Sequence, residues 1–155
     1  MPARAPLPAG VPNYVTPRGM TLLRQEAAEL EAERVRISAD VGDEAERTRR
    51  VAVLERRRAE LAARIGSATV VDRGAEPPDE IRFGATVTVR TLDGLDAGEE
   101  RRFTIVGVDE ASPADGRVAF LAPIAQAILG RRVGDVTTLR TAQGAQQLEI
   151  VAIRY

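Results

Sequence analysis

The sequence contains two helical segments of similar length, joined by a short acidic stretch. In the first segment the apolar residues recur at intervals of three and four, as Met20, Leu23, Ala27, Leu30, Ile37 and Val41. The second segment repeats this pattern with Val51, Leu54, Leu61, Ile65 and Ala68. Such spacing places a narrow apolar stripe along one side of each helix. Because the link is short, the two stripes can be buried only against each other, and the sequence predicts an antiparallel helical hairpin or coiled coil.

Local signals mark the ends of the two helices. Thr16 is a hydroxyl N-cap and Pro17 suits the first helical position, so the first helix is expected to run from Pro17 to about Val41. Gly42 interrupts the helical pattern, and the second helix is expected to continue to between Ile65 and Ser67.

Two arginines interrupt the apolar stripes at similar heights. Arg34 lies on the first stripe and Arg58 on the second. A long arginine side chain can cover apolar surface while its charged end remains in water. We therefore expect both guanidinium groups to reach past the seam towards neighbouring glutamates.

The link between the helices carries three carboxylates, those of Asp43, Glu44 and Glu46. One interpretation is local: Asp43 caps the second helix, and the two glutamates lie in its first turn, where the helix dipole favours negative charge. The other is functional, because a hairpin would present this acidic tip at its far end. Spacing alone leaves both interpretations open.

Composition excludes several classes of site. The chain has no cysteine and no histidine, which excludes disulfides, Cys/His zinc sites and histidine acid–base catalysis within it. Its formal net charge is −1, so it is not a strongly basic polyanion binder. No apolar run approaches the roughly 18 residues that span a bilayer, and the first 13 residues lack the apolar core of a secretion signal. We expect a cytoplasmic protein that does not contact a membrane.

The second half of the chain changes to the two-residue period of β-strands. Residues 72–80 form a polar, proline-containing linker, and five segments then read as strands: 81–91, 100–108, 117–121, 136–140 and 147–154. A short amphipathic helix is expected at 123–129, opened by Pro123 and closed by Gly130. The predicted class is α+β, with domain boundaries of 1–15 for a flexible tail, 16–71 for the hairpin, 72–80 for the linker and 81–155 for an antiparallel sheet domain with one short helix.

A set of short motifs gives the chain a resemblance to a known family. From Tyr14 to Tyr155 the sequence resembles the bacterial Gre transcript-cleavage factors, GreA and GreB. Each motif is weak alone, but their order and intervals are specific. The motifs are Thr16-Pro17-Arg18-Gly19, Ala68-Thr69-Val70-Val71-Asp72, Phe83-Gly84-Ala85-Thr86-Val87-Thr88-Val89, Ile105-Val106-Gly107-Val108-Asp109-Glu110, Ala122-Pro123-Ile124-Ala125-Gln126-Ala127-Ile128-Leu129-Gly130 and Val133-Gly134-Asp135.

The resemblance implies a function as an accessory factor rather than as an enzyme. In that family the hairpin enters the secondary channel of RNA polymerase, and the FKBP-like C-terminal domain docks at the channel rim. Asp43 and Glu46 match the acidic tip positions and would help to hold a magnesium ion shared with the polymerase, which promotes cleavage of backtracked RNA at its 3′ end. Glu44, Arg47 and Arg50 are candidate tip contacts, and Pro123, Ile124 and Ile128 are candidate docking residues. The isolated chain, expected to be a monomer, would hold no metal or cofactor of its own.

The sequence departs from the family pattern in ways that bear on this function. Arg47 and Arg50 replace the family's asparagine and tyrosine, and each arm is about one heptad shorter, or roughly 10 Å of helix. Ala122 and Gln126 replace a serine and a basic residue of the docking segment. The shortened arms together with Arg47 and Arg50 favour an alternative, a Gre-like regulator or inhibitor that occupies the channel without stimulating cleavage, whereas the retained Asp43 and Glu46 favour cleavage. The changes at Ala122 and Gln126 leave the short helix intact and bear on polymerase docking.

Three further alternatives remain at this stage. An FKBP-like fold would allow prolyl isomerase activity, although the sheet half offers only Phe83, Phe103, Phe120 and Tyr155 to line an aromatic pocket. The hairpin could also be a structural module for oligomerisation, in which case the acidic tip would have no role. Finally, the arginine run Arg47, Arg49, Arg50, Arg56, Arg57 and Arg58 is either a solvated helix face or a contact for RNA phosphates or acidic channel walls.

Overall fold

A computed structural model describes residues 4–74 and 76–155, and it divides the chain into two compact units. The hairpin unit comprises the residues up to Asn13 together with Pro17–Val70. The sheet unit comprises Tyr14–Thr16 together with Val71–Tyr155. The three residues Tyr14–Thr16 therefore belong with the sheet, although the sequence-based boundaries placed them in the tail and at the start of the hairpin.

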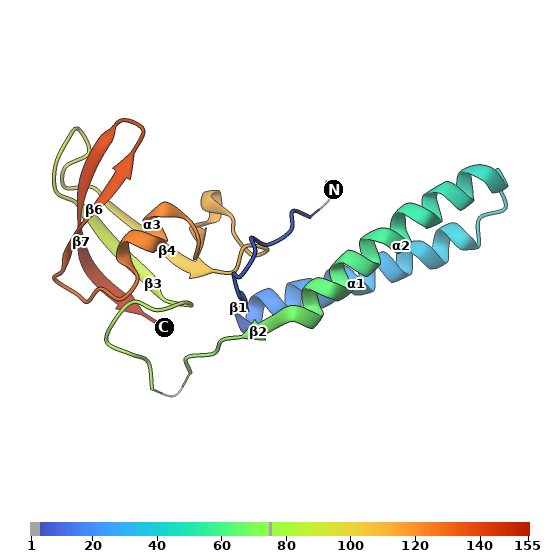
Figure 1. Cartoon of the computed structure of the whole chain (residues 1–155), viewed down its shortest axis with the longest axis horizontal. Helices are drawn as coiled ribbons and strands as arrows, with labels where there is room; N and C mark the ends of the chain where they lie inside the picture. The colour runs from blue at the N-terminus through green and yellow to red at the C-terminus, as the bar shows by residue number, and fades with distance from the viewer. Residues whose placement is uncertain (1–3, 75) are drawn as a thin grey trace. The chain divides into compact units, whose positions relative to one another are not determined.

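The hairpin unit consists of two helices that lie side by side, α1 (Pro17–Ser38) and α2 (Glu44–Ser67) (Figure 1). Their buried apolar residues come from the predicted stripes: Met20, Leu23, Ile37, Leu54 and Leu61. Leu61 is almost fully buried, at 1% exposure. At 1.5 Å per residue the helices are about 33 and 36 Å long.

The first helix ends earlier than the sequence pattern predicts. It ends at Ser38, and Val41, the expected last member of its stripe, is 99% exposed. The reason lies in the next few hydrogen bonds. The amide of Asp40 bonds the carbonyl of Ile37, three residues back, and the Asp40 carboxylate then accepts the amide of Gly42 at 3.2 Å. Aspartate side chains compete with the helix for backbone groups in this way, so the turn forms before Val41.

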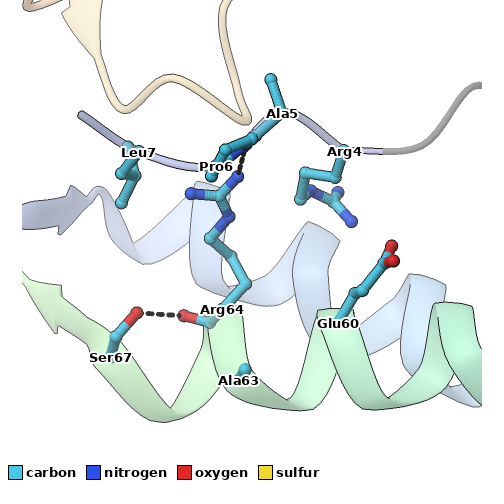
Figure 2. A pocket seen from close by; sticks show the side chains of 8 residues that line it. All are labelled: Arg4, Ala5, Pro6, Leu7, Glu60, Ala63, Arg64 and Ser67. Carbon is cyan, nitrogen blue, oxygen red and sulfur yellow. Dashed lines mark hydrogen bonds between the residues drawn. The ribbon is translucent and has the colours of Figure 1, made fainter. Parts of the chain in front are cut away.

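The N-terminal segment is bonded to the same hairpin (Figure 2). Arg4 pairs with Glu26 of α1 at 2.8 Å, and the guanidinium of Arg64 on α2 donates to the carbonyl of Ala5. Asn13 donates from Nδ2 to the carbonyl of Arg64 at 2.8 Å. Residues 4–13, which fall within the expected tail, thus contact both helices, while residues 1–3 lie outside the described range.

The sheet unit contains a five-stranded sheet in the order β5-β4-β3-β7-β6 (Figure 1). Its strands are β3 (Thr86–Thr91), β4 (Glu100–Val106), β5 (Arg117–Ala119), β6 (Val136–Thr141) and β7 (Gly144–Arg154). All five predicted strands are present, and the predicted short helix is α3 (Pro123–Ile128). A separate two-stranded sheet contains β1 (Asn13–Val15) and β2 (Ala68–Val70). The predicted fold class, a helical hairpin plus a sheet domain with one short helix, is confirmed.

The sheet is mixed rather than wholly antiparallel, because β5 runs parallel to β4. The connection between them reverses direction twice. Ser112 and Arg117 exchange main-chain hydrogen bonds of 2.9 and 3.0 Å around the 3₁₀ turn η1 (Pro113–Asp115). Gly116 then adopts a φ of 71°, which favours glycine, and returns the chain alongside β4. The period-two pattern predicted the strand β5 but carries no information on its direction.

The three residues contributed by the N-terminal part of the chain complete the core of the sheet unit. The ring of Tyr14 lies 5.7 Å from the rings of both Phe83 and Phe120, which are themselves 5.6 Å apart. Thr16 donates a hydrogen bond to the carboxylate of Glu110, a residue that is 6% exposed. Tilted and edge-on aromatic contacts of this kind stabilise a core beyond the apolar area that they bury.

This packing depends on the absence of a side chain at Gly107, which directly follows β4. A β-carbon at Gly107 would lie 2.4 Å from the main-chain carbonyl oxygen of Tyr14. We predict that Gly107→Ala lowers the free energy of unfolding of the sheet unit by about 1–3 kcal/mol, because backbone would have to move. All the tyrosines and phenylalanines lie in this unit, so near-ultraviolet circular dichroism measures it selectively.

Gly66 of α2 provides the matched control, since a β-carbon there would meet no atom within 4 Å. Gly66→Ala should stabilise the hairpin by about 0.5–1 kcal/mol, the usual gain from replacing a helical glycine. If Gly107→Ala leaves the unfolding of the sheet unit unchanged, the close approach of Tyr14 does not exist in solution.

Candidate functional site

The acidic tip is built on the start of α2. Asp43 is the N-cap residue, and its Oδ1 accepts a hydrogen bond from the amide of Ala45 at 2.9 Å. Glu44 and Glu46 lie in the first turn, where the positive end of the helix dipole stabilises carboxylates. All three side chains are exposed. The predicted cap is therefore confirmed, and the carboxylates remain accessible to a partner.

Arg47 ties together the loop that leads into this turn. Its Nη1 donates to the carbonyl oxygen of Asp40 at 2.6 Å and lies 3.5 Å from that of Gly42. Asp40 follows the last turn of α1 and Arg47 lies in the first turn of α2, so this contact joins the two arms across the loop. The resemblance marks Arg47 only as a candidate tip contact, and no pattern in the sequence indicates that Asp40 is its partner.

The other arginines near the tip make different contacts. Arg49 pairs with Glu46 at 3.0 Å, but both side chains are more than half exposed, so this pair contributes little to stability. Arg50 lines a shallow depression together with Glu33, Arg36 and Ile37 of α1. Glu46 therefore keeps an accessible carboxylate that a partner can compete for, whereas Arg50 faces the groove between the helices.

The tip alone offers too few ligands for a tight cation site. Among the residues that the structure describes, no group of three or more acidic side chains is placed to hold a metal ion. Asp43 and Glu46 are hard oxygen donors of the kind that magnesium prefers, and magnesium sites commonly use one or two protein carboxylates, with water and partner groups as the other ligands. Asp43 and Glu46 therefore have the donor chemistry that a magnesium ion could use.

A cluster of four charged residues holds the arms together behind the tip. Arg34 of α1 bonds Glu31 at 2.8 Å and lies 3.5 Å from Glu55 of α2. Arg58 of α2 bonds Glu31 at 2.7 Å and Glu55 at 3.0 Å. The hydrogen bond from Arg34 holds the pKa of Glu31 below its usual value, with Arg58 adding to the effect. The prediction that Arg34 and Arg58 reach past the seam to glutamates is confirmed.

The candidate docking residues lie on α3 of the sheet unit. Pro123 is exposed and Ile124 is half-buried, whereas Ile128 is fully buried and so belongs to the core. Gln126 donates from its Nε2 to the carbonyl of Phe120 at 2.7 Å, which ties α3 to the residues that precede it. Pro123 and Ile124 can therefore touch a partner, and Ile128 can only support them.

No helix in the described part of the chain is long and apolar enough to cross a membrane.

Phe83, Phe103 and Phe120 are each less than 9% exposed, and two of them pack on Tyr14. These rings form core contacts, so they do not line an aromatic pocket of the kind that an isomerase site needs.

Comparison with known proteins gives a consistent result. Residues 76–155 match the family described as "Transcription elongation factor, GreA/GreB, C-term". The chain is 34% identical to transcription elongation factor GreA of Chloroflexus aggregans over 156 residues, covering 92% of this chain and 98% of the relative. It is 33% identical to GreB of Neisseria meningitidis, covering 92% and 94%. Among solved structures, GreA factor homolog 1 (Gfh1) of Thermus thermophilus aligns over 94% of this chain with a TM-score of 0.41 and 22% identity.

The lowered pKa of Glu31 implies that the hairpin is less stable in acid than at neutral pH. Because the pKa of Glu31 is lowered in the folded state, its contribution to stability is complete above the unfolded value of about 4.3 and is lost as the pH falls through the lower, folded value. We predict that the melting temperature of the hairpin, followed by the circular dichroism of its helices, decreases once the pH is lowered below about 4.3. Glu31→Gln should melt lower at pH 7 and show a shallower decline. Glu29→Gln, on an exposed position of α1, is the control, and equal pH profiles for the two variants would contradict the prediction.

Proposed function

Because the chain belongs to the GreA/GreB family of transcription elongation factors, we propose that it binds bacterial RNA polymerase at the secondary channel, in the cytoplasm, and promotes cleavage of backtracked RNA through its acidic tip. The observation that carries this proposal is the exposed pair Asp43 and Glu46 at the turn between two long helices. The chain acts as an accessory factor, and the polymerase supplies the catalytic centre and the nascent RNA 3′ end.

The chemistry of the tip suits this role. Asp43 uses Oδ1 for the helix cap, and its second carboxylate oxygen remains for a ligand. Glu46 follows three residues later, in the exposed first turn of α2. A magnesium ion shared with the polymerase would supply an activated water and stabilise developing negative charge. The chain would contribute two hard oxygen ligands and hold them at the end of a stiff hairpin.

Docking is assigned to the sheet unit, with Pro123 and Ile124 as contacting residues and Ile128 as their support. This division of labour follows from exposure, because a buried residue cannot meet a partner. In this proposal the sheet unit provides the affinity for polymerase, and the tip of the hairpin unit provides the stimulation of RNA cleavage.

A second candidate function is occupation of the channel without cleavage. The observation that favours it is the state of the tip itself. Asp43 is already engaged as a cap, Glu46 is paired with Arg49, and Arg47 is bonded to the loop. Arms that are shorter by one heptad than in the Gre family would also keep the carboxylates about 10 Å from the position that the family reaches. Such a protein would act as an inhibitor or regulator.

The two remaining alternatives have less support. An FKBP-like isomerase site lacks its aromatic lining, since the phenylalanines lie in the core. A purely structural role for the hairpin would leave the tip carboxylates without a function, and the tip variants described next decide that question.

We predict that Asp43→Ala combined with Glu46→Ala abolishes stimulation of RNA cleavage while polymerase binding persists. Both residues lie at an exposed helix start, and loss of the Asp43 cap should cost only about 0.5–2 kcal/mol of stability. The measurement is shortening of the RNA 3′ end in backtracked elongation complexes. Asp43→Asn with Glu46→Gln is the matched control for folding, since asparagine caps helices as well as aspartate does while both charges are removed.

Binding is measured in the same experiment by pull-down of core polymerase. Ile124→Asp on α3 should weaken the pull-down, whereas Leu95→Asp, at a fully exposed leucine elsewhere on the sheet unit, should not. Cleavage at the native rate by the tip double variant would refute the catalytic role of the two carboxylates and leave binding in the channel possible.

The length of the arms separates the two functions. We predict that inserting seven residues after Leu30 and seven after Leu61 raises cleavage if the native protein is a non-cleaving occupant. The insertions add about 10 Å to each arm and keep the apolar stripes in phase. They also leave the Glu31–Arg34–Glu55–Arg58 cluster together on the tip side. If the native protein stimulates cleavage well and the lengthened one does so less well, the short hairpin must sit deeper in the channel. Occupation of the channel without cleavage is then excluded.

A further inference from the structure

We propose that Arg47 is a positioning residue that fixes the tip loop, residues 39–43, and thereby the direction of the Asp43 carboxylate. This inference rests on the proposed function, since the carboxylate is argued to act at the polymerase centre. Arg47 would touch neither the ion nor the RNA in this role. It acts through the main chain of the loop that carries Asp43.

The contacts of Arg47 span the loop from one arm to the other. The guanidinium donates to the Asp40 carbonyl at 2.6 Å, and because the donor is ionised this is a charge-assisted hydrogen bond. That carbonyl lies just beyond the C-terminal end of α1, where the orphan carbonyls and the negative end of the helix dipole favour a cation. The carbonyl oxygen of Gly42 lies 3.5 Å from the same nitrogen. The carbonyl groups of the residues before and after Val41 are therefore both close to the Arg47 guanidinium.

Two further hydrogen bonds, each from a main-chain amide to an aspartate side chain, restrain the loop. The carboxylate of Asp40 accepts the amide of Gly42 at 3.2 Å, and that of Asp43 accepts the amide of Ala45 at 2.9 Å. Val41 itself is 99% exposed, so no apolar packing holds it. The conformation of residues 40–43 therefore depends on polar contacts. Main-chain hydrogen bonds tie Asp40 to Ile37 of α1 and Asp43 to Arg47 of α2, and the Arg47 side chain bonds the end of the loop next to α1 to α2.

A fixed loop matters because magnesium is intolerant of misplaced ligands. Its oxygen ligands lie at about 2.0–2.1 Å in near-ideal octahedral geometry. A loop that samples several conformations would present the Asp43 carboxylate correctly for only part of the time, which reduces the apparent affinity for the ion by that fraction. The expected effect of losing Arg47 is thus a higher magnesium requirement rather than weaker polymerase binding.

The first test uses the isolated full-length chain. Backbone ¹⁵N relaxation should give order parameters near 0.85 for Val41 and Gly42 in the native protein and below about 0.6 in Arg47→Gln. Arg56→Gln, which removes the same charge at an exposed position further along α2, should leave both values unchanged. Arg47→Lys keeps the charge but loses the fork geometry and should give intermediate values. Unchanged loop order in Arg47→Gln overturns the proposal.

The second test uses backtracked elongation complexes with the full-length chain over a range of magnesium concentrations. In Arg47→Gln the half-saturating magnesium concentration for cleavage should rise about fivefold or more, with polymerase pull-down unchanged, and Arg47→Lys should recover part of the difference. An active native protein with an unchanged magnesium requirement in Arg47→Gln overturns the positioning role alone. A native protein that stimulates no cleavage overturns the positioning role together with the proposed cleavage function, and the native control reveals this case directly.

Discussion

The structure depends on the fact that each helix of the hairpin has only one long neighbour against which to bury its apolar stripe. Leu23, Leu54 and Leu61 are less than 5% exposed, and in the described part of this unit α1 and α2 are the only helices. A two-helix seam is narrow, so polar contacts at its edges matter more than they would in a large core. Three polar contacts join segments that the apolar seam alone would hold loosely. They are the Glu31–Arg34–Glu55–Arg58 cluster behind the tip, the Arg64–Ala5 bond and the Arg47–Asp40 bond.

The parts of the fold that the sequence predicts are those governed by short-range periodicity and by capping. The three- and four-residue spacing identifies both helices, the two-residue spacing identifies all five strands, and Asp43 is an N-cap by residue type alone. The parts that it misses involve partners distant in sequence or competition at an element end. Val41 fits the apolar stripe but lies outside the helix, because the Asp40 side chain and the Arg47 guanidinium form a turn before it. Nothing in the period of residues 117–119 indicates that β5 runs parallel to β4.

The same distinction applies to the candidate site. The carboxylates of Asp43 and Glu46 are found from the sequence because acidic residues at a helix start have a local signal. The packing of Tyr14 in the sheet unit is not predicted, since its partners Phe83 and Phe120 are 69 and 106 residues away in the sequence. Only the absence of a side chain at Gly107 leaves room for the backbone of Tyr14. The signal that could have pointed to it is the glycine in Ile105-Val106-Gly107-Val108, because an isolated glycine at the end of a strand pattern often marks a close approach of backbone.

Asp43 links the architecture of the hairpin to its proposed activity. As an N-cap it accepts a hydrogen bond from an amide that has no partner within the helix, and as a ligand it would have to present an oxygen to an external cation. A carboxylate can do both, because it has two oxygens and the cap uses only Oδ1. The cap then orients the second oxygen at no further conformational cost, provided that the preceding loop is itself fixed. In this chain the loop is fixed by an arginine rather than by apolar packing. Stability and activity at the tip therefore depend on the same few polar contacts, and a substitution that alters one of them should change the direction of the carboxylate before it changes the fold.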